Sequence, residues 1–117
     1  GTGDGLGTTL NFPLEAFSGD LIYLDIIKNK LIPVIQNFKP DLIIISAGFD
    51  AHEDDPLGQM KISSDGYREM TSMILKLAED VCDGRLLSML EGGYNHEALA
   101  DSVLNHVDTL LGLNGQA

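Results

Sequence analysis

Two short runs of apolar residues, each lying between segments with helical periodicity, constrain the fold of this chain most strongly. Residues 42–45 read Leu-Ile-Ile-Ile, and residues 86–90 read Leu-Leu-Ser-Met-Leu. Continuous apolar runs of this length are typical of strands that are buried on both faces in a parallel sheet. We therefore expect strands over residues 41–46 and 86–90.

Apolar residues recur at helical spacing in three further segments. The expected helices cover residues 19–38, 64–82 and 95–111. Asp20 is a candidate N-cap of the first helix, and Asn95 is the candidate N-cap of the last. Pro33 should kink the first helix or split off its last turn, because proline lacks the N–H that the helix needs.

Strands and helices therefore alternate, which predicts an α/β fold with a parallel sheet built by right-handed crossovers. A third short strand is expected over residues 8–12, where Pro13 ends it. A sheet of three strands is small, so at least one strand edge should be open for pieces that this chain lacks. Residues after Leu113 are expected to form a frayed tail.

Charge narrows the range of partners. The 117 residues include 18 acidic and 7 basic ones, which gives a net charge of −11. This balance argues against direct nucleic acid binding and against an anionic membrane surface. It could favour a cationic substrate through long-range attraction, although a solvated acidic surface is the simpler interpretation.

The remaining composition fits a packed intracellular domain. Hydrophobic residues make up 44% of the chain, and no stretch is long enough to be a membrane span. Cys82 is the one cysteine, so no internal disulfide can form, and we expect it in the core. We expect a cytoplasmic location. Because the chain starts with Gly1 and not methionine, we also expect that residue 1 is not the natural start.

Two loops follow the expected strands and carry the residues best suited to chemistry. They are residues 46–58 and residues 90–95. Ligands of open parallel sheets bind outside the carboxyl ends of the strands, so both loops should lie at one edge of the sheet. That edge gathers carboxylates, a histidine and a tyrosine.

Three segments carry a resemblance to a known family. They read SAGFDAHEDDPLG at residues 46–58, LEGGYN at 90–95 and GTGDGLGTTLNFPL at 1–14. In this order and spacing they resemble the late motifs of the histone deacetylase and acetylpolyamine amidohydrolase superfamily, and most closely its bacterial and class II-like members. The resemblance implies the parallel-sheet, three-layer fold of the arginase-like type. It also implies that residues 1–117 are only the C-terminal portion of one catalytic domain.

The resemblance assigns roles to five residues. Asp55 matches the family's late zinc ligand, and Tyr94 matches the tyrosine that donates a hydrogen bond to the reacting carbonyl. Asp50 matches an aspartate with an expected structural role. Gly92 and Gly93 match glycines that let the backbone come close to the metal. The family's two other zinc ligands and its pair of acid–base histidines lie upstream of residue 1.

The full-length protein is accordingly expected to hydrolyse N-acetyl amides with Zn²⁺. Catalytic zinc usually has three protein ligands and an open position for water, and it polarises the carbonyl. Partners would be an acetylated small molecule or an acetyl-lysine protein. The chain alone is expected to bind no zinc, to be inactive, and to self-associate through its open sheet edge.

Simpler interpretations stand beside each assignment. Asp55 precedes a proline and could simply start a turn, and Tyr94 could be a structural aromatic. His52 could be a second metal ligand, but we expect it to brace its loop or to be solvated. His96 and His106 are expected at the surface.

Other function classes also remain open. The chain could be a noncatalytic α/β binding or regulatory module, or a degenerate deacetylase homologue. A Mg²⁺-binding receiver-like domain is disfavoured, because Glu91-Gly92-Gly93-Tyr94 stands where a receiver needs a lysine. The glycine run at residues 1–7 precedes a strand instead of following one, so it is no dinucleotide fingerprint. We expect it to be a loop near the rim of the site.

Overall fold

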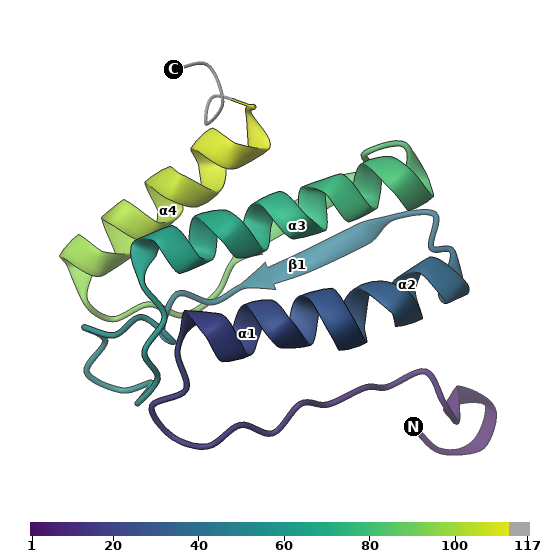
Figure 1. Cartoon of the computed structure of the whole chain (residues 1–117), viewed down its shortest axis with the longest axis horizontal. Coiled ribbons are helices and arrows are strands. Elements are labelled where there is room, and N and C mark those ends of the chain that lie inside the picture. The colour runs from purple at the N-terminus through teal and green to yellow at the C-terminus, as the bar shows by residue number, and fades with distance from the viewer. Residues whose placement is uncertain (113–117) are drawn as a thin grey trace.

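The computed structural model describes residues 1–112, so the expected tail after Leu113 lies outside the described residues. A short 3₁₀ turn, Gly3–Gly5, opens the chain. The other elements, in chain order, are α1 (Asp20–Ile26), a π-helical turn (Ile27–Leu31), α2 (Ile32–Phe38), β1 (Ile43–Ala47), α3 (Ser64–Cys82), β2 (Leu86–Leu90) and α4 (His96–Leu110) (Figure 1).

The two predicted central strands are present and parallel. β1 and β2 pair in a register that runs from Ile43 opposite Leu86 to Ala47 opposite Leu90. α3 provides the crossover between them, as the alternating pattern predicted. The α/β parallel architecture is therefore confirmed.

The prediction of a third strand over residues 8–12 is wrong. Residues 8–15 have no regular secondary structure, and the segment runs alongside α1 and α2 (Figure 1). Phe12 and Leu14 border a hollow of about 240 Å³ together with residues of α1 such as Tyr23. A strand needs a hydrogen-bonding neighbour, and the described part of the chain offers none beside this segment.

The helices cover one face of the sheet. Ile43 and Ala47 point toward them and are 9% and 8% exposed. On the opposite face Ile44 is 54% exposed, and Leu87 and Met89 are each 48% exposed. The expectation of strands buried on both faces is thus wrong for residues 1–112. The apolar composition of that face is real, but no described segment covers it.

The core lies between this sheet face and the helices. One cluster joins Ile43 to Leu77, Ala78 and Cys82 of α3, with Ile32 and Ile35 of α2 packed against it. Cys82 is 2% exposed, which confirms its predicted place in the core.

The first helix changes geometry before Pro33: a π-helical turn separates α1 from α2, and Pro33 lies at the start of α2 without splitting off a last turn. The N–H of Ile32 donates to the carbonyl of Ile27, which is the bond of a π-helical turn. Proline at position 33 removes one donor and crowds the preceding turn, so the helix widens there before α2 continues. The prediction that Asp20 is the N-cap is wrong, because Gly19 holds that position.

Asp20 instead ties α1 to the start of α3. Its carboxylate accepts hydrogen bonds from the N–H of Ser63 (2.8 Å) and from the Ser63 hydroxyl (2.6 Å). Ser63 is the N-cap of α3, and its hydroxyl oxygen accepts from the N–H of Gly66. At the other end of α3, Asp83 adopts a left-handed conformation and stops the helix as expected.

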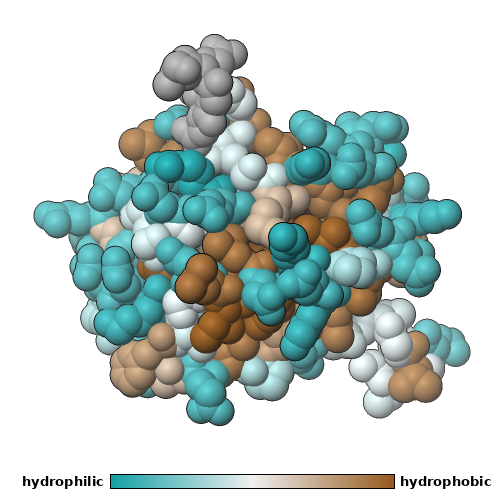
Figure 2. Space-filling model, viewed as in Figure 1, coloured by the Kyte–Doolittle hydropathy of each residue, from teal (hydrophilic) through white to brown (hydrophobic). Residues whose placement is uncertain are grey.

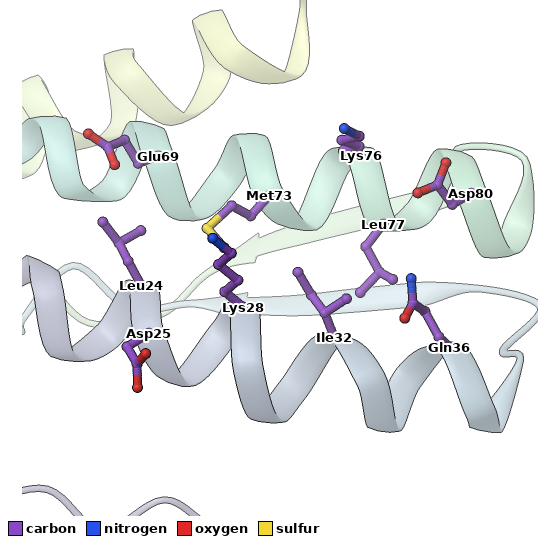
Figure 3. A pocket seen from close by; sticks show the side chains of 10 residues that line it. All are labelled: Leu24, Asp25, Lys28, Ile32, Gln36, Glu69, Met73, Lys76, Leu77 and Asp80. Carbon is purple, nitrogen blue, oxygen red and sulfur yellow. The ribbon is translucent and has the colours of Figure 1, made fainter.

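A groove of about 580 Å³ separates α1 and α2 from α3. Its floor is apolar and its rim is charged. Figure 2 shows brown surface at the centre of this face, and in Figure 3 Leu24 and Ile32 point toward α3 while Leu77 of α3 points toward them. Neither Asp55 nor Tyr94 lines it.

Candidate metal and catalytic site

The two loops predicted to meet do so at the carboxyl end of the sheet. Beyond the strands, the N–H of Glu91 donates to the carbonyl of Ala47 (3.0 Å), and the N–H of Phe49 donates to the carbonyl of Gly92 (2.7 Å). The strand pairing thus continues into both loops, which fixes their starting points relative to one another.

The carboxylate of Asp55 joins the two loops. Its Oδ1 accepts hydrogen bonds from the N–H groups of Leu57 (2.8 Å) and Gly58 (3.0 Å) in its own loop. Its Oδ2 accepts from the N–H of Tyr94 (2.8 Å) in the loop after β2. Asp55 therefore organises a turn, as the simpler interpretation expected, and also bridges to the predicted catalytic tyrosine.

These donors determine the charge of Asp55. Desolvation by burial is the largest single influence and raises the pKa of the carboxyl group, but the N–H donors of Tyr94, Leu57 and Gly58 together outweigh it. The pKa of Asp55 therefore lies below its ordinary value of 3.8. The group is ionised at neutral pH, which is the form that binds a metal ion.

Asn95 makes a second bridge beside the first. Its side-chain Nδ2 donates to the carbonyl of Asp54 (3.0 Å), and its Oδ1 accepts from the N–H groups of Glu97 and Ala98 (both 3.1 Å). The predicted capping role of Asn95 is confirmed. The bridge to Asp54 was missed, and its only signal in the sequence is that Asn95 directly follows Tyr94 in the LEGGYN motif.

His52 braces its loop, as predicted. It is 5% exposed. Its Nδ1 accepts from the N–H of Asp54 and its Nε2 lies 3.1 Å from the Ser64 hydroxyl oxygen. Because an N–H can donate only to an unprotonated nitrogen, the proton lies on Nε2 and points to Ser64. Both ring nitrogens are therefore engaged, which does not favour His52 as a second metal ligand.

Two glycines make room for Asp50. A Cβ atom on Gly48 would lie 2.9 Å from Asp50 Oδ1, and one on Gly92 would lie 2.9 Å from Asp50 Cγ. The Asp50 carboxylate thus packs against both strand ends, as suits its expected structural role. Gly93 has φ of +145°, and a Cβ there would meet Leu99 Cδ1 at 2.7 Å. Both glycines of the motif are needed for close packing.

The prediction that His106 lies at the surface is wrong, whereas His96 is exposed as expected. His106 is 7% exposed, with Nδ1 at 2.7 Å from the Thr71 hydroxyl oxygen and Nε2 at 2.8 Å from the Ser88 hydroxyl oxygen. Thr71 donates its own proton to the carbonyl of Tyr67, so His106 carries its proton on Nδ1. Desolvation by burial lowers the pKa of His106 below 6.5.

The glycine run at residues 1–7 does not border this site, although we expected it near the rim. The N-terminus lies on the side of the molecule away from the arrowhead of β1 (Figure 1). The run is held by its own turn, in which the N–H of Gly5 donates to the carbonyl of Thr2.

The donor set fits one part of a zinc site. Among residues 1–112, no group of three or more His, Cys, Asp or Glu side chains could hold a metal ion. Asp55 supplies one ionised carboxylate held in place by three backbone donors. Tyr94, whose main chain bonds to this carboxylate, is 54% exposed.

Comparisons with known proteins agree on one family. The family model described as "Histone deacetylase domain" matches residues 1–110. Histone deacetylase 14, chloroplastic, from Arabidopsis thaliana is 45% identical over 112 residues, which is 96% of this chain and 26% of that protein. A probable deacetylase from Archaeoglobus fulgidus is 45% identical over 97 residues, which is 83% of this chain and 27% of that protein.

A human relative and a solved structure extend the likeness. Polyamine deacetylase HDAC10 from Homo sapiens is 40% identical over 113 residues, covering 96% of this chain and 16% of that protein. The structure of the histone deacetylase Clr3 superposes with a TM-score of 0.89 at 38% identity, over 97% of this chain and 18% of that one. The chain spans about a quarter, or less, of the length of these proteins.

Proposed function

This chain belongs to the histone deacetylase domain family, and from that premise we propose that it is the C-terminal portion of a catalytic domain that hydrolyses N-acetyl amides. The observation that carries the proposal is the hydrogen bond between the Tyr94 N–H and Asp55 Oδ2. It links the main chain of Tyr94, the expected oxyanion donor, to Asp55, the expected metal ligand, in the loops that follow the two strands. The relatives named as histone and polyamine deacetylases support the same chemistry.

Zinc is the proposed metal, and Asp55 would be one of its three protein ligands. The other two would come from a part of the catalytic domain outside residues 1–117. When bound, the metal would polarise the amide carbonyl and lower the pKa of a water molecule. The N–H groups of Leu57, Gly58 and Tyr94 hold the Asp55 carboxylate ionised and oriented before any metal arrives.

Tyr94 would act on the substrate and not on the metal. Its main chain is held by Asp55, and the residue is 54% exposed. The phenol would donate a hydrogen bond to the carbonyl oxygen as negative charge develops there. Such a donor stabilises the transition state more than the ground state, so it raises the rate of the chemical step.

Acetyl-lysine in a protein and an acetylated polyamine are the two substrate classes we propose. The net charge of −11 would attract a cationic substrate and repel nucleic acid. None of the helices formed by residues 1–112 is long and apolar enough to cross a membrane. Because some relatives are named as chloroplastic, the expected cytoplasmic location stays a prediction.

The test compares residues 1–117 with the full-length protein. We expect the full-length protein to hold stoichiometric zinc and to release acetate from acetyl-lysine or acetylpolyamine substrates. We expect residues 1–117 alone to hold no stoichiometric zinc, because one carboxylate cannot form the site. Zinc in the full-length protein without hydrolysis of any acetyl amide would instead indicate a degenerate, noncatalytic homologue.

A further inference from the structure

Asn95 sits where a helix and two loops meet. Its Oδ1 accepts from the N–H groups of Glu97 and Ala98, which open α4, and its Nδ2 donates to the Asp54 carbonyl. An amide group is planar, so fixing the oxygen at the end of α4 also fixes the direction of the nitrogen. The helix therefore aims the donor at Asp54.

α4, which carries Asn95 at its N-cap, is held to the rest of the fold by buried polar contacts. His106, further along α4, lies within hydrogen-bond distance of Thr71 on α3 and of Ser88 on β2. Through His106, the C-terminal half of α4 is therefore joined to α3 and β2 by buried polar contacts. These contacts limit the movement of the helix as a whole relative to β2.

The two bridges run in opposite directions between adjacent residues. In one, the Asp55 side chain accepts from the main chain of Tyr94; in the other, the Asn95 side chain donates to the main chain of Asp54. The main-chain bonds from Glu91 to Ala47 and from Phe49 to Gly92 join the loops close to the strands, and these two bridges join them farther out, at the residues of the candidate site.

We propose that Asn95 is a positioning residue that sets the Asp55 carboxylate relative to Tyr94. This rests on the proposed function of those two residues. The side chain of Asn95 acts by holding the Asp54 carbonyl, and through it the backbone of Asp55, while the main-chain N–H of Asn95 also faces the Asp55 carboxylate. Outer partners of this kind commonly change metal affinity or activity about 10–100-fold when removed.

The substitution Asn95→Ser tests the bond from Asn95 to the Asp54 carbonyl separately from the capping of α4. Serine caps helices about as well as asparagine but is too short to reach the Asp54 carbonyl. In the full-length enzyme we expect kcat to fall about 10-fold with little change in KM, because the loss concerns the geometry of reacting groups. We expect the melting temperature to stay close to that of the wild type.

Hydrogen exchange at the Tyr94 amide gives a readout that needs no activity. That amide donates to Asp55. Loss of the bond between Asn95 and the Asp54 carbonyl should therefore speed its exchange about 10-fold, while amides in the middle of α4 keep their protection. Asn105→Ser is the matched control, since Asn105 lies on the same helix and accepts from Arg68 away from both loops. It should leave kcat and the Tyr94 amide unchanged.

The outcomes separate the two claims. If the wild type is inactive but Asn95→Ser still speeds exchange at the Tyr94 amide, the proposed function is overturned and the positioning role of Asn95 is supported. If the wild type is active and Asn95→Ser changes neither kcat nor exchange at the Tyr94 amide, only the positioning role of Asn95 is overturned. If the serine variant does not fold, Asn95→Asp keeps the capping oxygen, lacks the donor, and is judged by the same two measurements.

Discussion

Asp55 is held by the main chain of Tyr94 and not by its phenol: the Tyr94 N–H lies 2.8 Å from Asp55 Oδ2. The two expected functional groups are thus linked through one backbone amide, which every amino acid except proline supplies at position 94. The ring can therefore be altered without breaking the contact that orients the carboxylate. Substitutions at the two positions should for that reason have separable effects.

Tyr94→Phe should remove the oxyanion donor and nothing else. The ring is kept, and the amide that bonds to Asp55 is unaffected. Loss of one such donor typically costs about 10²–10³ in kcat, or roughly 3–4 kcal/mol of transition-state stabilisation. Steady-state kinetics with zinc analysis of the full-length enzyme would measure this. A near-normal kcat on a good acetyl-amide substrate would show that Tyr94 is structural.

Asp55→Ala should lose metal as well as activity. It removes the proposed ligand and also the acceptor for the N–H groups of Leu57, Gly58 and Tyr94. Elemental analysis of the full-length variant should find zinc strongly reduced. Glu53→Ala is the matched control, because it makes the same charge change two residues away at an exposed position. Full zinc occupancy in Asp55→Ala would exclude Asp55 as a ligand.

Gly58→Ala should disturb the site through the backbone. A Cβ atom at position 58 would overlap the carbonyl oxygen of Asp50, so the loop must shift, and with it the Gly58 N–H that bonds to Asp55. We expect a loss of stability of about 1–3 kcal/mol by urea unfolding. Gly5→Ala is the control, since its Cβ would meet only the Thr8 hydroxyl oxygen at an ordinary 3.6 Å. Equal stability of the two variants would contradict this account.

Local signals in the sequence predicted the elements that depend on local physics. The apolar period and the turn residues around α3 gave its bounds, and β2 was predicted over the residues it occupies. The strand at residues 8–12 failed because strand formation depends on a neighbour, which sequence pattern does not reveal. Burial of the second face of β1 and β2 likewise depends on a covering segment, and residues 1–112 contain none.

The sequence predicts which residues form the candidate site, but not the hydrogen bonds that join them. Asp55 and Tyr94 stood out through motif and position at strand ends, but the main-chain bond between them depends on the loop conformations. His106 was misplaced because its burial depends on the side of α4 that meets α3 and β2, where Thr71 and Ser88 supply polar partners. Polar residues on a helix normally indicate its exposed side.

The open side of the sheet should make residues 1–117 self-associate or leave them only marginally stable. Ile44, Leu87 and Met89 form an apolar face without a cover among residues 1–112. Sedimentation over a range of concentrations should show oligomers, and Ile44→Lys should reduce them. Leu104→Lys on exposed α4 surface is the control. A thermally stable monomer at high concentration would mean that this face needs no cover.

His106 should make stability depend on pH near neutrality. Burial lowers its pKa in the folded state below the ordinary 6.5, so between these two values the unfolded chain binds more protons. Its contribution to stability is therefore complete above about pH 6.5 and is lost as pH falls from there through the folded-state pKa. The slope from one proton cannot exceed about 1.4 kcal/mol per pH unit. Urea unfolding between pH 7.5 and 5.5, values spanning about one unit on each side of 6.5, should show this decline.

His106→Gln tests the assignment, because glutamine cannot titrate in this range. We expect the variant to be less stable than the wild type at the higher pH, since the contacts with Thr71 and Ser88 are disturbed. The difference between the two proteins should shrink as pH falls, and all other titrating groups cancel in that difference. His96→Gln, at an exposed position on the same helix, should leave the stability at pH 7.5, about one unit above 6.5, close to that of the wild type. A stability difference between His106→Gln and wild type that stays constant with pH would mean that His106 keeps its ordinary pKa in the folded protein.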